Sequence, residues 1–239
     1  MSMKPSTILA LAAGLALAAC STDPPSGSLA YKEGKLGNGS FLFKCDDNLA
    51  CDRWSGSVDT FPTEVASGSN FELRFVAEGR EGPIVKIGDK TYDGVTAQPV
   101  APYLDRGPDG FTALRPGYGT VVAKDARGFI IDYATIKIVK PDGLVVYDAS
   151  LRGSENPPQL ETLSLKVDQR RSFRTVAERK DQPIAGALRV EWSSADPSIV
   201  QVESYLKGVV NLVAKSPGKT RLTVSSAALT KEISVGVTQ

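Results

Sequence analysis

The chain has 239 residues, of which 41% are hydrophobic and 23% charged, a composition that supplies a folded core and matches ordinary globular proteins. Lysine and arginine number 28 against 27 aspartates and glutamates, so no strong net field favours nucleic acid as a partner. The sequence contains no histidine, which excludes Ser-His-Asp and Cys-His catalysis and histidine-containing zinc sites.

Residues 1–19 are predicted to be a signal peptide. Lys4 gives a positive start, residues 8–19 are an almost uninterrupted apolar run, and small residues precede Cys20. The run is too short to span a bilayer as a stable helix, which takes about 20 residues. The segment Leu17-Ala18-Ala19-Cys20 resembles the lipobox of bacterial lipoproteins. That resemblance implies cleavage before Cys20, a diacylglycerol on its sulfur, and acylation of the new amino terminus, for example by palmitate.

Residues 20–29 are interpreted as the lipidated cysteine and a flexible tether, because they are rich in serine, proline and glycine. Ser21 follows the cysteine at the position where lipoproteins of the inner membrane often carry aspartate. The resemblance therefore favours a lipid-anchored location in the cell envelope, at the outer membrane. An ordinary secreted protein whose cleavage site happens to precede a cysteine is the alternative.

The two remaining cysteines, Cys45 and Cys51, bracket five residues. In the oxidising compartment that an exported protein enters, they are predicted to form a structural disulfide. Closing so short a loop contributes about 2–2.5 kcal/mol. The spacing differs from the C-x-x-C of redox sites, and neither a histidine nor a fourth cysteine is present to complete a metal site.

Beyond residue 70 the chain consists of short alternating or apolar stretches separated by glycine- and proline-bearing turns, the pattern of antiparallel β-structure. A polar, proline-paired stretch at 151–158 is the predicted linker. The predicted fold is all-β, with two tandem immunoglobulin-like β-sandwiches at 30–150, which includes the disulfide loop, and 159–239. The expected strands of the first domain are 71–76, 83–87, 120–123, 129–133, 135–139 and 144–147, with turns at 81–83, 105–110, 115–117 and 141–143.

The second domain carries a recognisable series of features. Trp192-Ser-Ser-x-Asp-Pro-Ser is followed by an apolar strand, a glycine-led strand at 208–214, and Pro217-Gly218 before the next strand. This series resembles the bacterial immunoglobulin-like domains of invasin- and intimin-type proteins. The resemblance implies a β-sandwich with Trp192 packed inside, and no chemistry. Residues 110–123 repeat part of the series, so the first domain is predicted to be a diverged sandwich of related architecture.

No catalytic, cofactor-binding or metal-binding residue is predicted. Two acidic groups suggest calcium as an alternative, but neither has the ordered spacing of a calcium loop, so they are interpreted as carboxylates of solvated turns. A basic cluster is interpreted as the charges of an exposed strand edge. The acidic groups are Asp46, Asp47 and Asp52, and Asp105 with Asp109; the basic cluster is Arg170, Arg171, Arg174, Arg179 and Lys180.

The seven tyrosines of the chain could stack on sugars, and the positions of three of them indicate another role. Tyr133 and Tyr147 lie within predicted strands, and Tyr118 lies in a predicted turn. Packing in the core or at its rim is the expected role of all three.

The sequence thus predicts a non-enzymatic envelope lipoprotein that displays immunoglobulin-like domains for adhesion, or for binding another envelope protein or a glycan. The expected partners are the membrane, through the lipid, and an unidentified envelope protein or glycan, but not nucleic acid. A structural spacer in a larger envelope complex is one alternative. A hydrolase that uses carboxylates alone is another, although no acidic pair stands out in the sequence.

Overall fold

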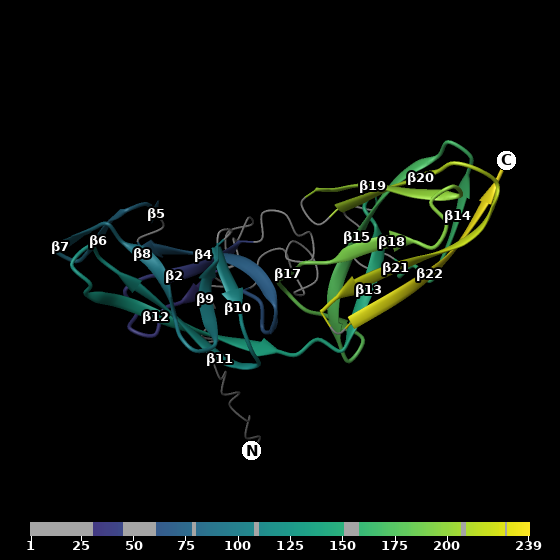
Figure 1. Ribbon diagram of the computed structural model, residues 1–239. Coiled ribbons are helices and arrows are strands. Elements are labelled where there is room, and N and C mark those ends of the chain that lie inside the picture. Colours follow the sequence, from purple (N-terminus) through teal and green to yellow (C-terminus); the bar gives the residue numbers. More distant parts are fainter. Residues whose placement is uncertain are drawn as a thin grey trace, which may run out of the picture.

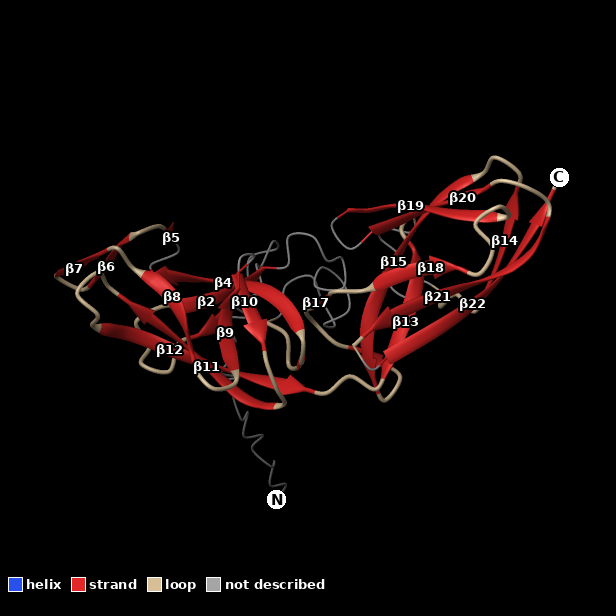
Figure 2. Cartoon of the chain, in the orientation of Figure 1, coloured by secondary structure: helices blue, strands red, loops and turns tan. Residues whose placement is uncertain are grey.

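The computed structural model describes residues 31–44, 61–77, 80–107, 110–150, 158–206, 209–227 and 229–239, and these residues form an all-β structure (Figure 2). Within this part of the chain there is no helix, and so none long and apolar enough to cross a membrane. The signal peptide, the tether, Cys20, the Cys45–Cys51 pair and residues 151–157 of the predicted linker lie outside the described residues.

The N-terminal half is built from two main sheets. One has the strand order β1-β2-β4-β10-β9, formed by Tyr31–Glu33, Ser40–Lys44, Ser69–Ala77, Gly110–Ala113 and Leu104–Gly107. The other has the order β3-β12-β11-β8, formed by Val65–Ala66, Ile130–Val139, Gly117–Lys124 and Thr96–Val100. A short strand β5 (Arg80–Glu81) pairs with β4, and β6 (Ile84–Ile87) and β7 (Lys90–Asp93) form a separate hairpin.

The C-terminal half also contains two sheets. The first has the order β13-β15-β20-β19, formed by Gly143–Asp148, Arg170–Arg179, Val209–Ala214 and Val200–Leu206. The second has the order β14-β22-β21-β18, formed by Thr162–Lys166, Leu229–Thr238, Gly218–Ser226 and Glu191–Ser194. A short strand β16 (Gln182–Pro183) pairs with the end of β15.

The two halves share one strand order. The sheet order β2-β4-β10-β9 of the N-terminal half corresponds to β13-β15-β20-β19 of the C-terminal half. The order β3-β12-β11-β8 corresponds in the same way to β14-β22-β21-β18. In each half the short second strand runs parallel to the last strand, and the remaining pairs are antiparallel. The order β2-β4-β10-β9 against β8-β11-β12 is that of strands A, B, E and D against C, F and G in immunoglobulin constant-type domains.

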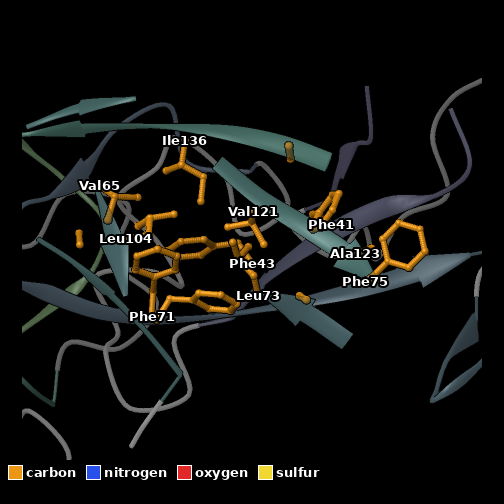
Figure 3. Close-up of a cluster of buried hydrophobic side chains, with 14 of the residues drawn as sticks. Phe41, Phe43, Val65, Phe71, Leu73, Phe75, Leu104, Val121, Ala123 and Ile136 are labelled. Atoms are coloured by element: carbon orange, nitrogen blue, oxygen red, sulfur yellow. The ribbon is translucent and has the colours of Figure 1, made fainter. Parts of the chain in front are cut away.

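The core of the N-terminal half lies between its two sheets (Figure 3). Alternate residues of β4 point inward, as expected for a strand with one buried face. Phe71 of β4 stacks on Phe43 of β2 at 5.2 Å between ring centroids and on Phe111 of β10 at 5.8 Å. The opposite sheet contributes smaller side chains, among them Val121 and Ala123.

The core of the C-terminal half is aliphatic around a single buried phenylalanine, Phe173. Trp192 is partly buried and packs against this core, as the resemblance implied. Leu222 and Val224 of β21 point inward, in the positions that Val121 and Ala123 occupy in β11.

Three details differ from the sequence-based expectations. Residues 105–107, predicted to belong to a turn, are part of β9, because Leu104–Gly107 pairs along its length with β10. The two strands predicted at 129–133 and 135–139 are one continuous strand, β12, with a register shift where it pairs with Ala123 and Lys124. The strand Gly143–Asp148, expected in the first domain, pairs with β15 and contributes Leu144 and Val146 to the C-terminal core.

The two halves meet through β17 (Ala187–Leu188), which leaves the C-terminal half and pairs with the start of β4 (Figure 1). Just before it, the Ala66 N–H donates to the carbonyl of Ala185 at 2.8 Å. A small buried cluster of Ala66, Val139, Ala177 and Ile184, with Leu188 against it, lies at this junction.

Candidate functional site

The outward surface of β8, β11 and β12 in the N-terminal half carries exposed tyrosines, and we call it the tyrosine face. Tyr118 on β11 is 66% exposed and Tyr133 on β12 is 36% exposed. Exposure on a strand of this sheet contradicts the expectation that both pack in the core or at its rim. Tyr147, by contrast, is buried in β13, and burial raises the pKa of its hydroxyl to about 12. The tyrosine face comprises Thr96, Gln98 and Val100 of β8, Tyr118, Thr120, Val122 and Lys124 of β11, and Ile130, Tyr133, Thr135 and Lys137 of β12.

Strand alternation sets the composition of this face. On β11 the inward positions hold Gly119, Val121 and Ala123, which are fully buried or nearly so. A Cβ on residue 119 would lie 2.6 Å from Cγ of Leu104, a β9 residue of the opposite sheet, so the inward side has no room for larger side chains. The large polar and aromatic residues of β11 consequently stand on the outer side.

The cross-strand register places the face's side chains in rows. One row is Gln98, Val122 and Tyr133, and the next is Val100, Thr120 and Thr135. Directly opposite residues on one face of a sheet contact each other. Val122, although outward, is only 6% exposed, as expected for a side chain flanked by two larger ones.

The face has a one-sided charge pattern. No aspartate or glutamate occupies any of its outward positions, whereas Lys124 and Lys137 border it. Lys137 is held at its edge by Glu64, with Nζ 2.6 Å from Oε1. The face itself therefore repels neither neutral nor acidic groups and is dominated by hydroxyl, amide and aromatic side chains.

The corresponding sheet of the C-terminal half provides an internal reference. Gly117 pairs with Ile138 and Gly218 pairs with Val237, so the registers of the two strand pairs superpose. By this register the position of Tyr118 is taken by Lys219, and that of Tyr133 by Glu232. The same scaffold thus carries charged side chains where the N-terminal half carries tyrosines.

Two carboxylates anchor the loops around the face. Asp132 is fully buried; its Oδ1 accepts hydrogen bonds from the N–H groups of Leu36 and Tyr133, and its Oδ2 one from Asn38, each at 2.8 Å. In the turn between β11 and β12, burial of Asp125 opposes ionisation. The Arg127 side chain and the N–H groups of Phe129 and Arg127 outweigh it, so the pKa of Asp125 lies below its ordinary value. The strands that carry the two tyrosines are therefore firmly held.

The basic cluster is distributed over ion pairs rather than gathered as a binding patch. Arg170 contacts Glu203 at 2.7 Å, Arg171 is paired with the buried Asp148, and Arg179 contacts Glu64 at 3.1 Å. Arg174 is half-buried on the same strand, and the exposed Lys180 follows its end. This surface is a set of local charge pairs along β15.

The calcium alternative gains no support from the described residues. Asp105 uses Oδ1 to accept a hydrogen bond from the N–H of Arg106 at 2.8 Å, and Asp109 and the acidic loop at 46–52 lie outside the described part. In that part no group of three or more cysteines, aspartates or glutamates is placed to hold a metal ion.

Comparisons with known proteins find similarity among solved structures. No protein-family model and no curated protein matches the chain. Among solved structures, domains 4 and 5 of the S-layer protein SbsC match at 14% identity with a TM-score of 0.32, over 70% of this chain and 100% of that one. The Yersinia pseudotuberculosis adhesin InvE matches at 13% sequence identity with a TM-score of 0.31, over 74% of this chain and 57% of that one. The D0-D1 domain of intimin matches at 13% identity with a TM-score of 0.27, over 74% of this chain and 95% of that one.

A longer SbsC structure is matched over only 27% of its length. The immunoglobulin-like interpretation rests on the strand order described above.

Proposed function

We propose that this chain is a non-enzymatic binding protein of the bacterial cell envelope, anchored through lipid on Cys20, with two tandem immunoglobulin-like sandwiches. The observation that carries the proposal is the tyrosine face. Because the second copy of the same sheet places Lys219 and Glu232 at these positions, the fold does not require tyrosines there. Exposed tyrosine is instead enriched at surfaces that contact a partner, since its ring buries a large area and its hydroxyl stays hydrogen-bonded.

The anchor is tested by Cys20→Ala. We expect this variant to leave the membrane fraction for the soluble fraction, because without Cys20 no lipid can be attached and the two or three acyl chains that would hold the protein at the bilayer are absent. Retention of the variant in detergent-extractable membranes would contradict the anchor.

Binding is tested in the Cys20→Ala chain, so that lipid does not mask it. We expect Tyr118→Ala with Tyr133→Ala to weaken retention on isolated envelopes at least tenfold, which corresponds to about 1.4 kcal/mol and is within the range for aromatic contacts. The matched control is Lys219→Ala with Glu232→Ala at the equivalent positions of the other half. Equal retention of both double variants would contradict the proposal and favour the spacer alternative.

A further inference from the structure

We infer that the partner of the tyrosine face is an extended polysaccharide chain. The inference rests on the proposed function and assigns a chemical class to its partner. It follows from how the side chains of the face are spaced, what they can hydrogen-bond, and which other partners they disfavour.

The spacing favours a linear partner. Tyr118 lies opposite Lys137, and Tyr133 lies opposite Val122, four residues further along the β11 strand. At about 3.4 Å per residue the two tyrosines are roughly 14 Å apart along the strands. Thr120 and Thr135 face each other between them. Two aromatic contacts joined by a flat polar track suit a chain that lies along the sheet, rather than a single small molecule.

The chemistry of the track matches that of sugars. A pyranose ring has apolar C–H faces, which pack on an aromatic ring, and a rim of hydroxyl groups that both donate and accept hydrogen bonds. Threonine hydroxyls and the glutamine amide also do both. Gln98 already donates from Nε2 to Oγ1 of Thr96 at 3.1 Å, which orients its amide oxygen as an acceptor.

Other partner classes fit this surface less well. The cores of protein interfaces are continuous apolar patches. Here the two exposed aliphatic side chains, Val100 at 41% and Ile130 at 56%, lie on different strands and in different cross-strand rows, those of Thr120 and Lys124. A nucleic acid needs many cationic contacts, and of the two bordering lysines Lys137 is already paired with Glu64. A lipid surface needs protruding apolar side chains, and threonines separate the tyrosines.

The experiment uses envelopes in three forms as the probe: untreated, treated with periodate to cleave sugar diols, and treated with protease. Retention of the Cys20→Ala chain is expected to survive protease and to fall at least tenfold after periodate. Tyr118→Phe should bind within about threefold of the parent because the stacking ring remains, whereas Tyr118→Ala should not.

The outcomes separate the inference from the function on which it rests. Tyrosine-dependent retention that resists periodate, or that protease removes, would overturn the polysaccharide and leave the binding function standing. Retention that does not depend on the tyrosines would overturn both. Self-association of the purified chain that Tyr118→Ala abolishes in sedimentation would replace the polysaccharide with a second copy of the chain.

Discussion

The two halves of the molecule use one strand order and differ on the surface they present. In both, the strand pair that opens at Pro116-Gly117 or Pro217-Gly218 turns small or aliphatic side chains inward. Outward, the N-terminal half presents tyrosine, threonine and glutamine, while the C-terminal half presents opposed charges such as Arg221 and Glu232, 3.3 Å apart. The scaffold constrains the inward residues and leaves the outward ones free to vary, so a difference between the outer faces of the two halves points to function.

The halves also differ in the segment that follows β5 and β16. In the N-terminal half this segment is the β6–β7 hairpin, which places Val85 in the local core. In the C-terminal half the equivalent residues 184–188 pair with the other half instead. Figure 1 shows the hairpin at one end of the molecule and β17 between the halves. The segment after the short strand β5 is thus an outer hairpin in the N-terminal half, whereas the equivalent segment after β16 forms the junction between the halves.

The largest expected effect comes from Asp132→Ala. This carboxylate accepts three N–H groups at a fully buried site, so its removal should lower the free energy of unfolding by about 4 kcal/mol, at 1.5 kcal/mol or so per charge-assisted bond. The equivalent position in the C-terminal half is Lys231, whose Nζ lies 3.0 Å from Glu161 near the surface. Lys231→Ala should cost less than about 1 kcal/mol. Urea denaturation of both variants measures the difference, and similar costs would show that Asp132 does not organise the loop.

A smaller effect is expected from Gly186→Ala at the junction. Residue 186 has φ of 105°, and a Cβ there would overlap the buried hydroxyl of Ser69, which donates to the carbonyl of Ala66 at 2.6 Å. Backbone strain and overpacking together should cost about 3 kcal/mol. Gly68 is the control, since its φ is 83° but its Cβ would meet nothing nearer than Leu188 at 4.0 Å.

Gly68→Ala should therefore lower the free energy of unfolding only through strain of the backbone, by about 1–2 kcal/mol. We further expect Gly186→Ala, but not Gly68→Ala, to separate the thermal unfolding of the two halves in calorimetry. A single unchanged transition in both variants would mean that the junction does not couple them.

The sequence predicted the strands better than the surface. Alternation located most strands, and the shared Pro-Gly openings indicated the relation between the halves, because both signals are local. The exposure of Tyr118 was not predictable, because Leu104 of the opposite sheet fills the space above Gly119 and turns the tyrosine outward. Residues 105–107 carry turn-like residues yet form a strand through pairing with β10. Contacts between distant segments decided both cases: the packing of Leu104 against Gly119 fixes which side of the alternating strand is buried, and pairing with β10 makes residues 105–107 a strand.

The smallest effect tests the charges that link the halves. Glu64 lies beside Lys137 of the N-terminal half and Arg179 of the C-terminal half. The Lys137 hydrogen bond, with Arg179, lowers the pKa of Glu64 below its ordinary value of 4.5 despite partial burial. The ion pairs therefore stabilise the fold fully above that value, and the stabilisation is lost as pH falls through the lowered pKa.

Glu64→Gln should cost about 1 kcal/mol at pH 7, because these side chains are partly exposed, and progressively less as the pH falls below 4.5 toward the lowered pKa of Glu64. The matched control is Glu232→Gln, which breaks the exposed pair with Arg221 within one half and should cost under about 0.5 kcal/mol. Denaturation of both variants across this pH range measures the two costs. A Glu64→Gln cost that persists undiminished at pH 3 would mean that the side chain acts through packing at the junction, and the charge link between the halves would then have to be abandoned.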